Sequence, residues 1–267
     1  MGKICIVAIC SAWLWLVSLG AVVAWGAESG DSTADRWTYT FIPYVWATGI
    51  KGSISTLPPL PSASINTSFS DIIKDLDLGF MGTAEMRKGR FGIIADVFWT
   101  KLSSDVATPS GVIFNGGTLD SQMLMTTVGG AYRIAEEERV WLDLLTGIRG
   151  YYVNTDLNLR PGSGFAGSGL GARSLSDSNS TGWVDGLAGL RGQVTIWKGL
   201  YARATTVIGT GGSNLVLDLM GGMGYQFSRL FSVFAGYRYL KVDYHKSSGF
   251  IWDVEFKGPV LGIGFTF

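Results

Sequence analysis

The sequence predicts an all-β protein that folds as a closed antiparallel transmembrane β-barrel of about ten strands, with eight or twelve possible. Three observations predict this fold. The chain stops on a strand whose alternate residues Leu261, Ile263, Phe265 and Phe267 are apolar and separated by small residues. Similar alternation recurs along the chain, and its 267 residues include 38 glycines and only 16% charged residues. A final strand leaves an unpaired edge unless it pairs with the first strand, as it does in a closed barrel.

The N-terminal segment predicts a secretory signal peptide over residues 1–26, which leaves residues 27–267 for the barrel. Lys3 precedes an apolar run that extends to Ala24, and small residues follow before Glu28, the first acidic residue. A single transmembrane anchor is the alternative, because the run is just long enough to cross a bilayer.

The composition of the remaining chain excludes several kinds of chemistry. Without Lys3, 20 basic side chains stand against 21 acidic ones, and no basic stripe indicates a nucleic-acid partner. Both cysteines, Cys5 and Cys10, fall in the N-terminal segment, so the barrel can form no disulfide and no thiolate site. With a single histidine as well, we expect no metal and no cofactor.

The strands can be placed from the alternating residues and from the turn-forming residues between them. Ten are expected, at about 37–47, 78–88, 90–102, 118–133, 140–156, 181–196, 200–209, 214–227, 230–243 and 251–267. Short connections alternate with longer ones. In outer-membrane barrels the short turns and both chain ends lie on the periplasmic side, which requires an even number of strands.

The first long connection, about residues 48–77, has structure of its own. Segments 51–56 and 62–69 flank a proline-rich tip and predict a hairpin that projects beyond the membrane. The residues from Ser70 to Leu76 predict a helical turn that Ser70 could cap. This turn could fold over or into the barrel as a partial plug, or it could be an ordinary packed loop.

The terminal strand resembles that of the outer-membrane β-barrel proteins of Gram-negative bacteria, in which a final Phe serves as an assembly signal. The resemblance assigns that role to Phe265 and Phe267. It implies an integral outer-membrane location, contact with outer-membrane lipid and lipopolysaccharide, and recognition by the barrel assembly machinery; any small solute is unknown.

The chain also resembles a group of proteobacterial outer-membrane proteins of about 250 residues with no established activity. The shared motifs are Pro43-Tyr44-Val45-Trp46-Ala47, Ser68-Phe69-Ser70-Asp71-Ile72, Arg87-Lys88-Gly89-Arg90-Phe91-Gly92 and Gly236-Tyr237-Arg238-Tyr239. This resemblance implies a fold and a location, and it implies no activity.

Charged residues fall on the less apolar face of each predicted strand, which faces the lumen if the apolar face contacts lipid. The set contains five acids and five arginines: Glu85, Arg87, Asp96, Asp143, Arg149, Asp185, Arg191, Arg203, Asp218 and Arg238. Arginine suits such positions because its planar fork can engage carboxylates from neighbouring strands. The balanced charge predicts a salt-bridged interior that holds the barrel, or else a small polar pore or binding site.

Aromatic residues predict two girdles at the membrane interfaces, with core packing as the alternative. The girdle near the short turns would contain Trp141, Trp197, Tyr201, Phe227, Phe231 and Phe267. The girdle near the long loops would contain Trp46, Trp99, Tyr152, Trp183 and Tyr239.

We therefore expect a non-enzymatic barrel with a structural, small-solute pore or surface-binding role. One alternative is an outer-leaflet lipid-modifying enzyme, because His245 and Ser247 faintly resemble the His and Ser of lipid A deacylases, with Glu255 as the nearest acid. Ser248 and Gly249 replace the Asn-Ala that follows Ser in that family, so a solvated loop histidine is expected instead. A soluble, secreted ligand-binding barrel with its apolar side inward is the second alternative.

Overall fold

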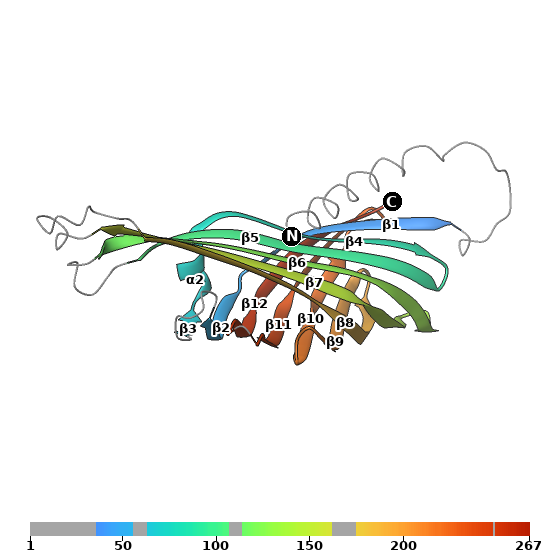
Figure 1. The fold of residues 1–267 in the computed structure, drawn as a ribbon. Coiled ribbons are helices and arrows are strands. Elements are labelled where there is room, and N and C mark those ends of the chain that lie inside the picture. The colour runs from blue at the N-terminus through green and yellow to red at the C-terminus, as the bar shows by residue number, and fades with distance from the viewer. Residues whose placement is uncertain (1–35, 56–62, 107–113, 162–174, 248) are drawn as a thin grey trace, which may run out of the picture. The chain divides into compact units, whose positions relative to one another are not determined.

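The computed structural model describes residues 36–55, 63–106, 114–161, 175–247 and 249–267. Within these ranges ten strands form a closed antiparallel barrel (Figure 1), which confirms the predicted fold class. They are β1 (Trp37–Trp46), β4 (Leu76–Lys88), β5 (Phe91–Val106), β6 (Phe114–Glu136), β7 (Val140–Pro161), β8 (Leu175–Trp197), β9 (Leu200–Gly211), β10 (Leu215–Gln226), β11 (Phe231–His245) and β12 (Ile251–Thr266). The predicted signal peptide lies outside the described residues.

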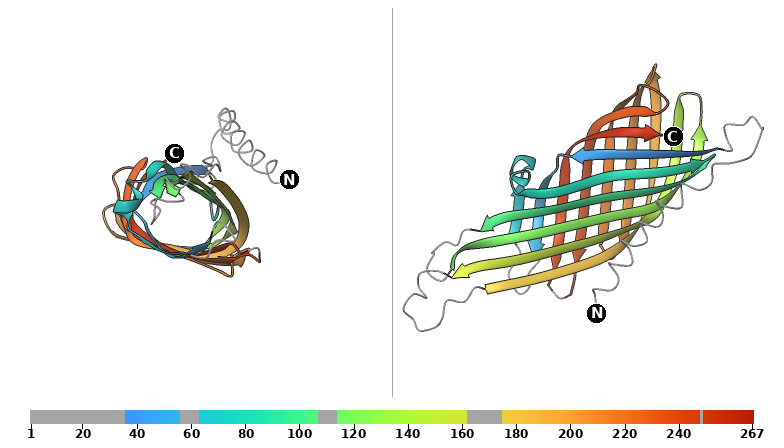
Figure 2. Two further views of the ribbon diagram at one scale, coloured as in Figure 1. Left: turned by 60° about the vertical axis from the view of Figure 1, so that its left-hand side comes forward. Right: turned by 90° about the horizontal axis from the view of Figure 1, so that it is seen from above.

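The barrel closes because the last strand pairs with the first. β1 and β12 run antiparallel, with Thr40 opposite Thr266. Backbone hydrogen bonds of 3.0 and 2.8 Å join Tyr39 to Phe267 and extend this pairing to the final residue of the sequence. Viewed along the barrel, the strands form one ring around a lumen (Figure 2, left).

Two further strands, β2 (Gly49–Ser55) and β3 (Ala63–Thr67), form the hairpin predicted in the first long connection. β12 pairs with β1 along its C-terminal half and with β2 over Ile251 to Lys257. Because β1 and β2 pair with successive parts of the same strand, β12, β2 continues the line of β1 after a short break. The hairpin therefore extends the barrel wall beyond the end of β1.

A short helix, α2 (Phe69–Ile72), follows the hairpin, and the sequence misplaced its cap. The N-cap is Ser68, and Ser70 lies inside the helix. The Ser68 hydroxyl donates to Asp71 Oδ2 at 2.5 Å and, with Lys74, holds the pKa of Asp71 below its usual range. No residue of α2 is buried, so the helix is no plug inside the lumen. Among the described residues no helix is long and apolar enough to cross a membrane.

The large apolar residues of β12 point outward in one part of the strand and inward in the other. Toward the chain end, Leu261, Ile263 and Phe265 point outward and are 61, 41 and 37% exposed, and small residues point inward. Toward the other end, Asp253, Glu255 and Lys257 point outward, and the inward residues are large, apolar and buried: Trp252, Val254 and Phe256. The exterior is thus apolar over one part of the strand and polar over the other.

β7 shows the same exchange. Near the short turns its outward residues include Leu144 and Ile148, whereas Asn154 and Asp156 point outward further along. The strand has 22 residues and is about 70 Å long. This length exceeds the apolar band of an outer-membrane barrel, roughly 25 Å. The strands therefore continue beyond the membrane as a barrel with a hydrophobic interior, which explains why several of them outrun their predicted ends.

The structure also corrects the predicted aromatic girdles. Trp197, Phe227 and Phe267 are 67, 61 and 71% exposed, as expected of interfacial residues near the short turns. Four members of the predicted girdles point inward instead: Trp46, Trp183 and Tyr201 are buried, and Trp141 lines the lumen. For these four, the alternative of core packing holds.

Candidate functional site: a cationic vestibule in the lumen

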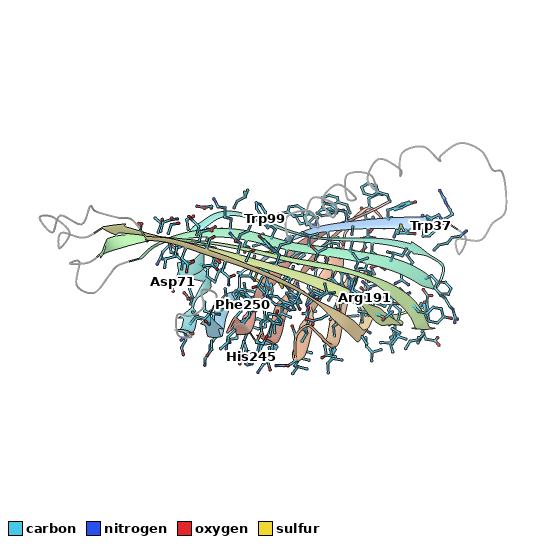
Figure 3. The ribbon with its side chains drawn as sticks, viewed as in Figure 1. Trp37, Asp71, Trp99, Arg191, His245 and Phe250 are labelled. Carbon is cyan, nitrogen blue, oxygen red and sulfur yellow. The ribbon has the colours of Figure 1, made fainter. Side chains whose placement is uncertain are left out.

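The lumen contains a cavity of about 360 Å³ lined by residues of all ten barrel strands. It reaches Thr38 and Gln226, which are exposed and lie beside the short turns. Figure 3 shows Trp37 and Arg191 toward this end of the barrel, and Asp71 and Phe250 toward the other. We call this cavity the vestibule and the barrel end beside the short turns the short-turn rim.

The structure brings the ten predicted lumen charges into the barrel interior. Eight line the vestibule: Glu85, Arg87, Asp96, Arg149, Arg191, Arg203, Asp218 and Arg238. The other two, Asp143 and Asp185, are fully buried. Nine of the ten charges divide into one group near the short-turn rim and a second group deeper in the barrel, and Asp185 belongs to neither.

The group near the rim is a closed ring of ion pairs from β4, β7 and β8. Arg191 donates to both oxygens of Glu85, at 2.7 and 3.0 Å, and to Asp143 Oδ2 at 2.8 Å. Arg87 donates to the same Asp143 oxygen at 2.7 Å and to Glu85 Oε1 at 3.0 Å. Four side chains thus tie three strands together across the lumen.

Arg133 of β6 joins this ring, and the sequence analysis missed it. Its Nε lies 2.5 Å from Asp143 Oδ1, and its Nη1 lies 2.9 Å from Glu136 at the rim. A period-two count along β6 would have found it, because Arg133 shares the inward face with Thr127, which lines the vestibule. Arg133 thus adds a sixth arginine to the predicted five, and Glu136 adds a sixth acid at the rim.

Arg203 is the arginine of this group without an acid. It lies opposite Gln193 in the register of β8 and β9 and donates two hydrogen bonds to the amide Oε1, at 3.0 and 2.7 Å. Among the described residues no carboxylate forms an ion pair with it. A neutral amide therefore occupies the place where a carboxylate would neutralise the guanidinium.

Three arginines of the rim group lie close to the ring of Trp141. The guanidinium carbons of Arg133, Arg191 and Arg203 lie 4.4, 5.5 and 5.5 Å from its ring. Such cation–π contacts offset part of the mutual repulsion of the arginines. Including Arg87, four arginines surround two carboxylates, the largely buried Glu85 and the fully buried Asp143, and the acid Glu136 stands half-exposed at the rim. The rim group thus carries an excess of positive charge.

The deeper group centres on Asp218. Arg238 donates to both of its oxygens, at 3.0 and 2.7 Å, and Arg149 donates to Oδ2 at 2.8 Å. Arg238 also donates to the Tyr44 hydroxyl at 3.3 Å, and that hydroxyl in turn donates to Asp96 Oδ2 at 3.1 Å. Two arginines and two carboxylates balance here.

Asp185 stands apart from both groups. It lies opposite Arg149 in the register of β7 and β8, yet the Arg149 guanidinium reaches Asp218 instead. Asp185 Oδ1 accepts the backbone N–H of Ser213 at 2.6 Å. Its role is thus to hold the connection after β9.

Above the deeper group, large apolar side chains fill the lumen. Trp46 and Phe256 are 1% exposed, and Leu240 and Val242 are fully buried. Further along, Trp183 stacks between Tyr151 and Tyr244, with ring centroids 4.8 and 4.1 Å apart. We call this packing the apolar layer. The Arg238 guanidinium lies 4.8 Å from the Trp46 ring, so the layer begins directly on the deeper charge group.

Inward glycines keep the vestibule from filling in the same way. A Cβ added at Gly224 of β10 would lie 2.2 Å from the Tyr201 ring, and one at Gly222 would lie 2.8 Å from the Phe234 ring. Both aromatic rings therefore lie against the wall of the barrel and not across it.

The residues of the predicted lipid-modifying site are not brought together. His245 ends β11, is half-exposed, and has Asp243 Oδ1 3.7 Å from its Nε2. Glu255 lies opposite Lys241, four positions along the ladder from the pair that His245 forms with Ile251. No hydrogen bond joins His245 to Ser247. Within the described ranges no group of three or more His, Cys, Asp or Glu side chains could hold a metal ion.

The closed barrel, its exposed apolar belt and its charged lumen define the class of the protein. In lipid every backbone polar group needs an internal partner, and a closed barrel supplies one to each strand. The chain is therefore an integral outer-membrane β-barrel protein of the Gram-negative type, as its terminal strand indicated. The exposed belt contradicts the alternative of a soluble secreted barrel.

No protein-family model matches the sequence, and no curated protein matches it at a significant level. Similar solved structures include the outer-membrane protease OmpT of Escherichia coli, with a TM-score of 0.49 and 12% identity over 90% of this chain and 99% of that chain. Ail of Yersinia pestis has a TM-score of 0.38 and 16% identity over 87% and 99% of the two chains. Neisserial surface protein A has a TM-score of 0.35 and 14% identity over 87% and 100%. All three TM-scores are below 0.5, so the activities of these proteins have no bearing on this chain.

Proposed function

We propose that the protein is a non-enzymatic, small-solute-binding barrel whose lumen is a blind vestibule. The vestibule opens at the short-turn rim, which faces the periplasm in outer-membrane barrels. The apolar layer closes the lumen toward the long loops. A pore through the whole barrel, which the sequence left open as an alternative, is not part of this proposal.

One observation supports this proposal above the others: the apolar layer stands directly above a polar cavity. Trp46, Phe256, Leu240 and Val242 are at most 1% exposed, so there is no water-filled path between them. A packed layer of this kind excludes hydrated ions, because it offers no polar partners for them. The vestibule below it, at about 360 Å³, has the size of a small-molecule site.

Conductance in planar bilayers tests the closed lumen. The wild-type protein should insert without a steady unitary conductance, because ions cannot cross the apolar layer. Trp46→Ala combined with Phe256→Ala should produce a conductance, since it removes two of the largest side chains of the layer. Phe227→Ala, at an exposed position outside the barrel, is the matched control and should leave the protein non-conducting. A steady wild-type conductance would refute the blind vestibule.

A further inference from the structure

The excess positive charge of the vestibule points to the class of solute. Arg203 has a neutral partner, Gln193, and its guanidinium lies 5.5 Å from the Trp141 ring, the same distance as that of the ion-paired Arg191. A guanidinium stays charged in proteins, so it cannot relieve the excess by losing a proton. Burying such a charge without a counter-charge is unfavourable, and a bound anion would compensate it.

Several hydrogen-bond donors of the vestibule have no partner among the described residues. Arg87 Nη1, Arg191 Nε and Thr205 Oγ1 are buried and unpaired. All three residues line the same cavity as Arg203. A buried donor without an acceptor costs free energy, so the wall of the vestibule has more hydrogen-bond donors than acceptors, as a site for an acceptor-rich solute would.

We propose that the vestibule binds a small oxyanion, a solute with a phosphate or carboxylate group, and that Arg203 is its principal contact. This inference rests on the blind vestibule proposed above and names its solute class. Guanidinium groups suit oxyanions because their fork matches two oxygens of a carboxylate or phosphate. The cavity volume restricts the solute to a small molecule.

The specific test of this site is Gln193→Glu. The new carboxylate would meet Arg203 where the amide oxygen now accepts two hydrogen bonds, so the fold is preserved while the excess charge falls by one. Arg203→Gln removes the proposed contact itself. Lys257→Gln, which removes one positive charge from an exposed outward position on β12, is the matched control.

Isothermal titration calorimetry of the refolded full-length protein in detergent, at low ionic strength, gives the readout. Inorganic phosphate and succinate are the two probes, and their relative affinities distinguish a phosphate-bearing from a carboxylate-bearing solute. We expect saturable binding of at least one probe, weakened at least tenfold by Gln193→Glu and by Arg203→Gln and unchanged by Lys257→Gln. Thermal unfolding confirms that each variant is folded.

Two results would overturn the oxyanion site: no saturable binding of either probe, or wild-type affinity in both vestibule variants. Either result, obtained with a barrel that conducts no ions, would leave the blind vestibule standing and remove only its solute class. A steady wild-type conductance would refute the blind vestibule whatever the titrations show.

Discussion

Arg203 and Gln193 face each other across β8 and β9, and both hydrogen bonds from the guanidinium end on the amide oxygen of Gln193, at 3.0 and 2.7 Å. Glutamate has nearly the same shape as glutamine and would neutralise Arg203. The presence of the amide leaves a cation facing the vestibule. Stability and binding are therefore expected to change in opposite directions at this position.

Gln193→Glu should stabilise the folded protein by about 1 kcal/mol, because a hydrogen bond between two charged groups is stronger than one to an amide. Gln193→Leu should destabilise it by about 1–3 kcal/mol, since Arg203 then loses its acceptor. Reversible urea unfolding in lipid vesicles measures both changes. Loss of stability in Gln193→Glu would mean that Arg203 is already neutralised.

Arg238→Ala should cost more stability than Arg149→Ala. Arg238 makes two hydrogen bonds to Asp218 and lies against Trp46, so its removal leaves a buried carboxylate and a gap below the apolar layer. We expect a loss of about 3–5 kcal/mol for Arg238→Ala. Arg149 makes one bond to Asp218, which keeps Arg238 as a partner after Arg149→Ala. The same urea titrations rank the two variants, and the reverse order would contradict the geometry of the deeper group.

Ile148→Arg should destabilise the barrel by about 2–4 kcal/mol, because Ile148 points outward from the apolar belt and is 59% exposed. Asn158→Arg, outward on the same strand beyond the belt, should change stability by less than about 0.5 kcal/mol. Unfolding in vesicles compares the pair. Equal penalties would show that the exchange of faces along β7 does not mark the membrane boundary.

Phe267→Ala should slow insertion into the outer membrane and leave the stability of the folded barrel almost unchanged. The Phe267 side chain is 71% exposed, and its backbone hydrogen bonds to Tyr39 survive the substitution. Outer-membrane levels after export, together with unfolding of the purified protein, separate the two effects. Normal levels of the variant would argue against an assembly role for this residue.

Asp71 should titrate below the ordinary range of an aspartate, because the Ser68 hydroxyl and Lys74 stabilise its ionised form. Since the folded pKa is lowered, any stability that this group adds to α2 is present at neutral pH. It is lost as the pH falls through the folded pKa. NMR titration of Ser68→Ala should show the pKa of Asp71 moving upward toward its ordinary value. An unmoved pKa would exclude the hydroxyl as the cause.

The sequence predicts the strands and the inward face of the membrane-spanning part well, because a period-two pattern is a local property. The prediction fails where the large apolar residues of a strand point into the lumen and not toward lipid. At Trp46 and Trp183 large apolar side chains point inward although their outward neighbours Val45 and Val184 are also apolar, so both faces of the strand are apolar there. The apolar layer, and with it the closed lumen, therefore could not be predicted from a single rule for all positions.

The sequence also could not predict which charged side chains pair with each other. Arg149 lies beside Asp185 in register but reaches Asp218 on β10, a choice that depends on side-chain packing across the lumen. Arg133 was within reach of the alternation and was missed. The excess positive charge of the rim group depends on pairing that only the structure shows: Arg203 faces the amide of Gln193, and Asp185 binds the backbone N–H of Ser213 instead of an arginine.

Labelling of single cysteines tests the blind vestibule most directly. In a chain with Cys5 and Cys10 replaced by serine, Ser232→Cys lies in the vestibule and Leu240→Cys in the apolar layer. A small, membrane-impermeant thiol reagent should modify Ser232→Cys from the short-turn side only and should modify Leu240→Cys from neither side. Modification of Ser232→Cys from the long-loop side would show a continuous path through the barrel and contradict the closed lumen.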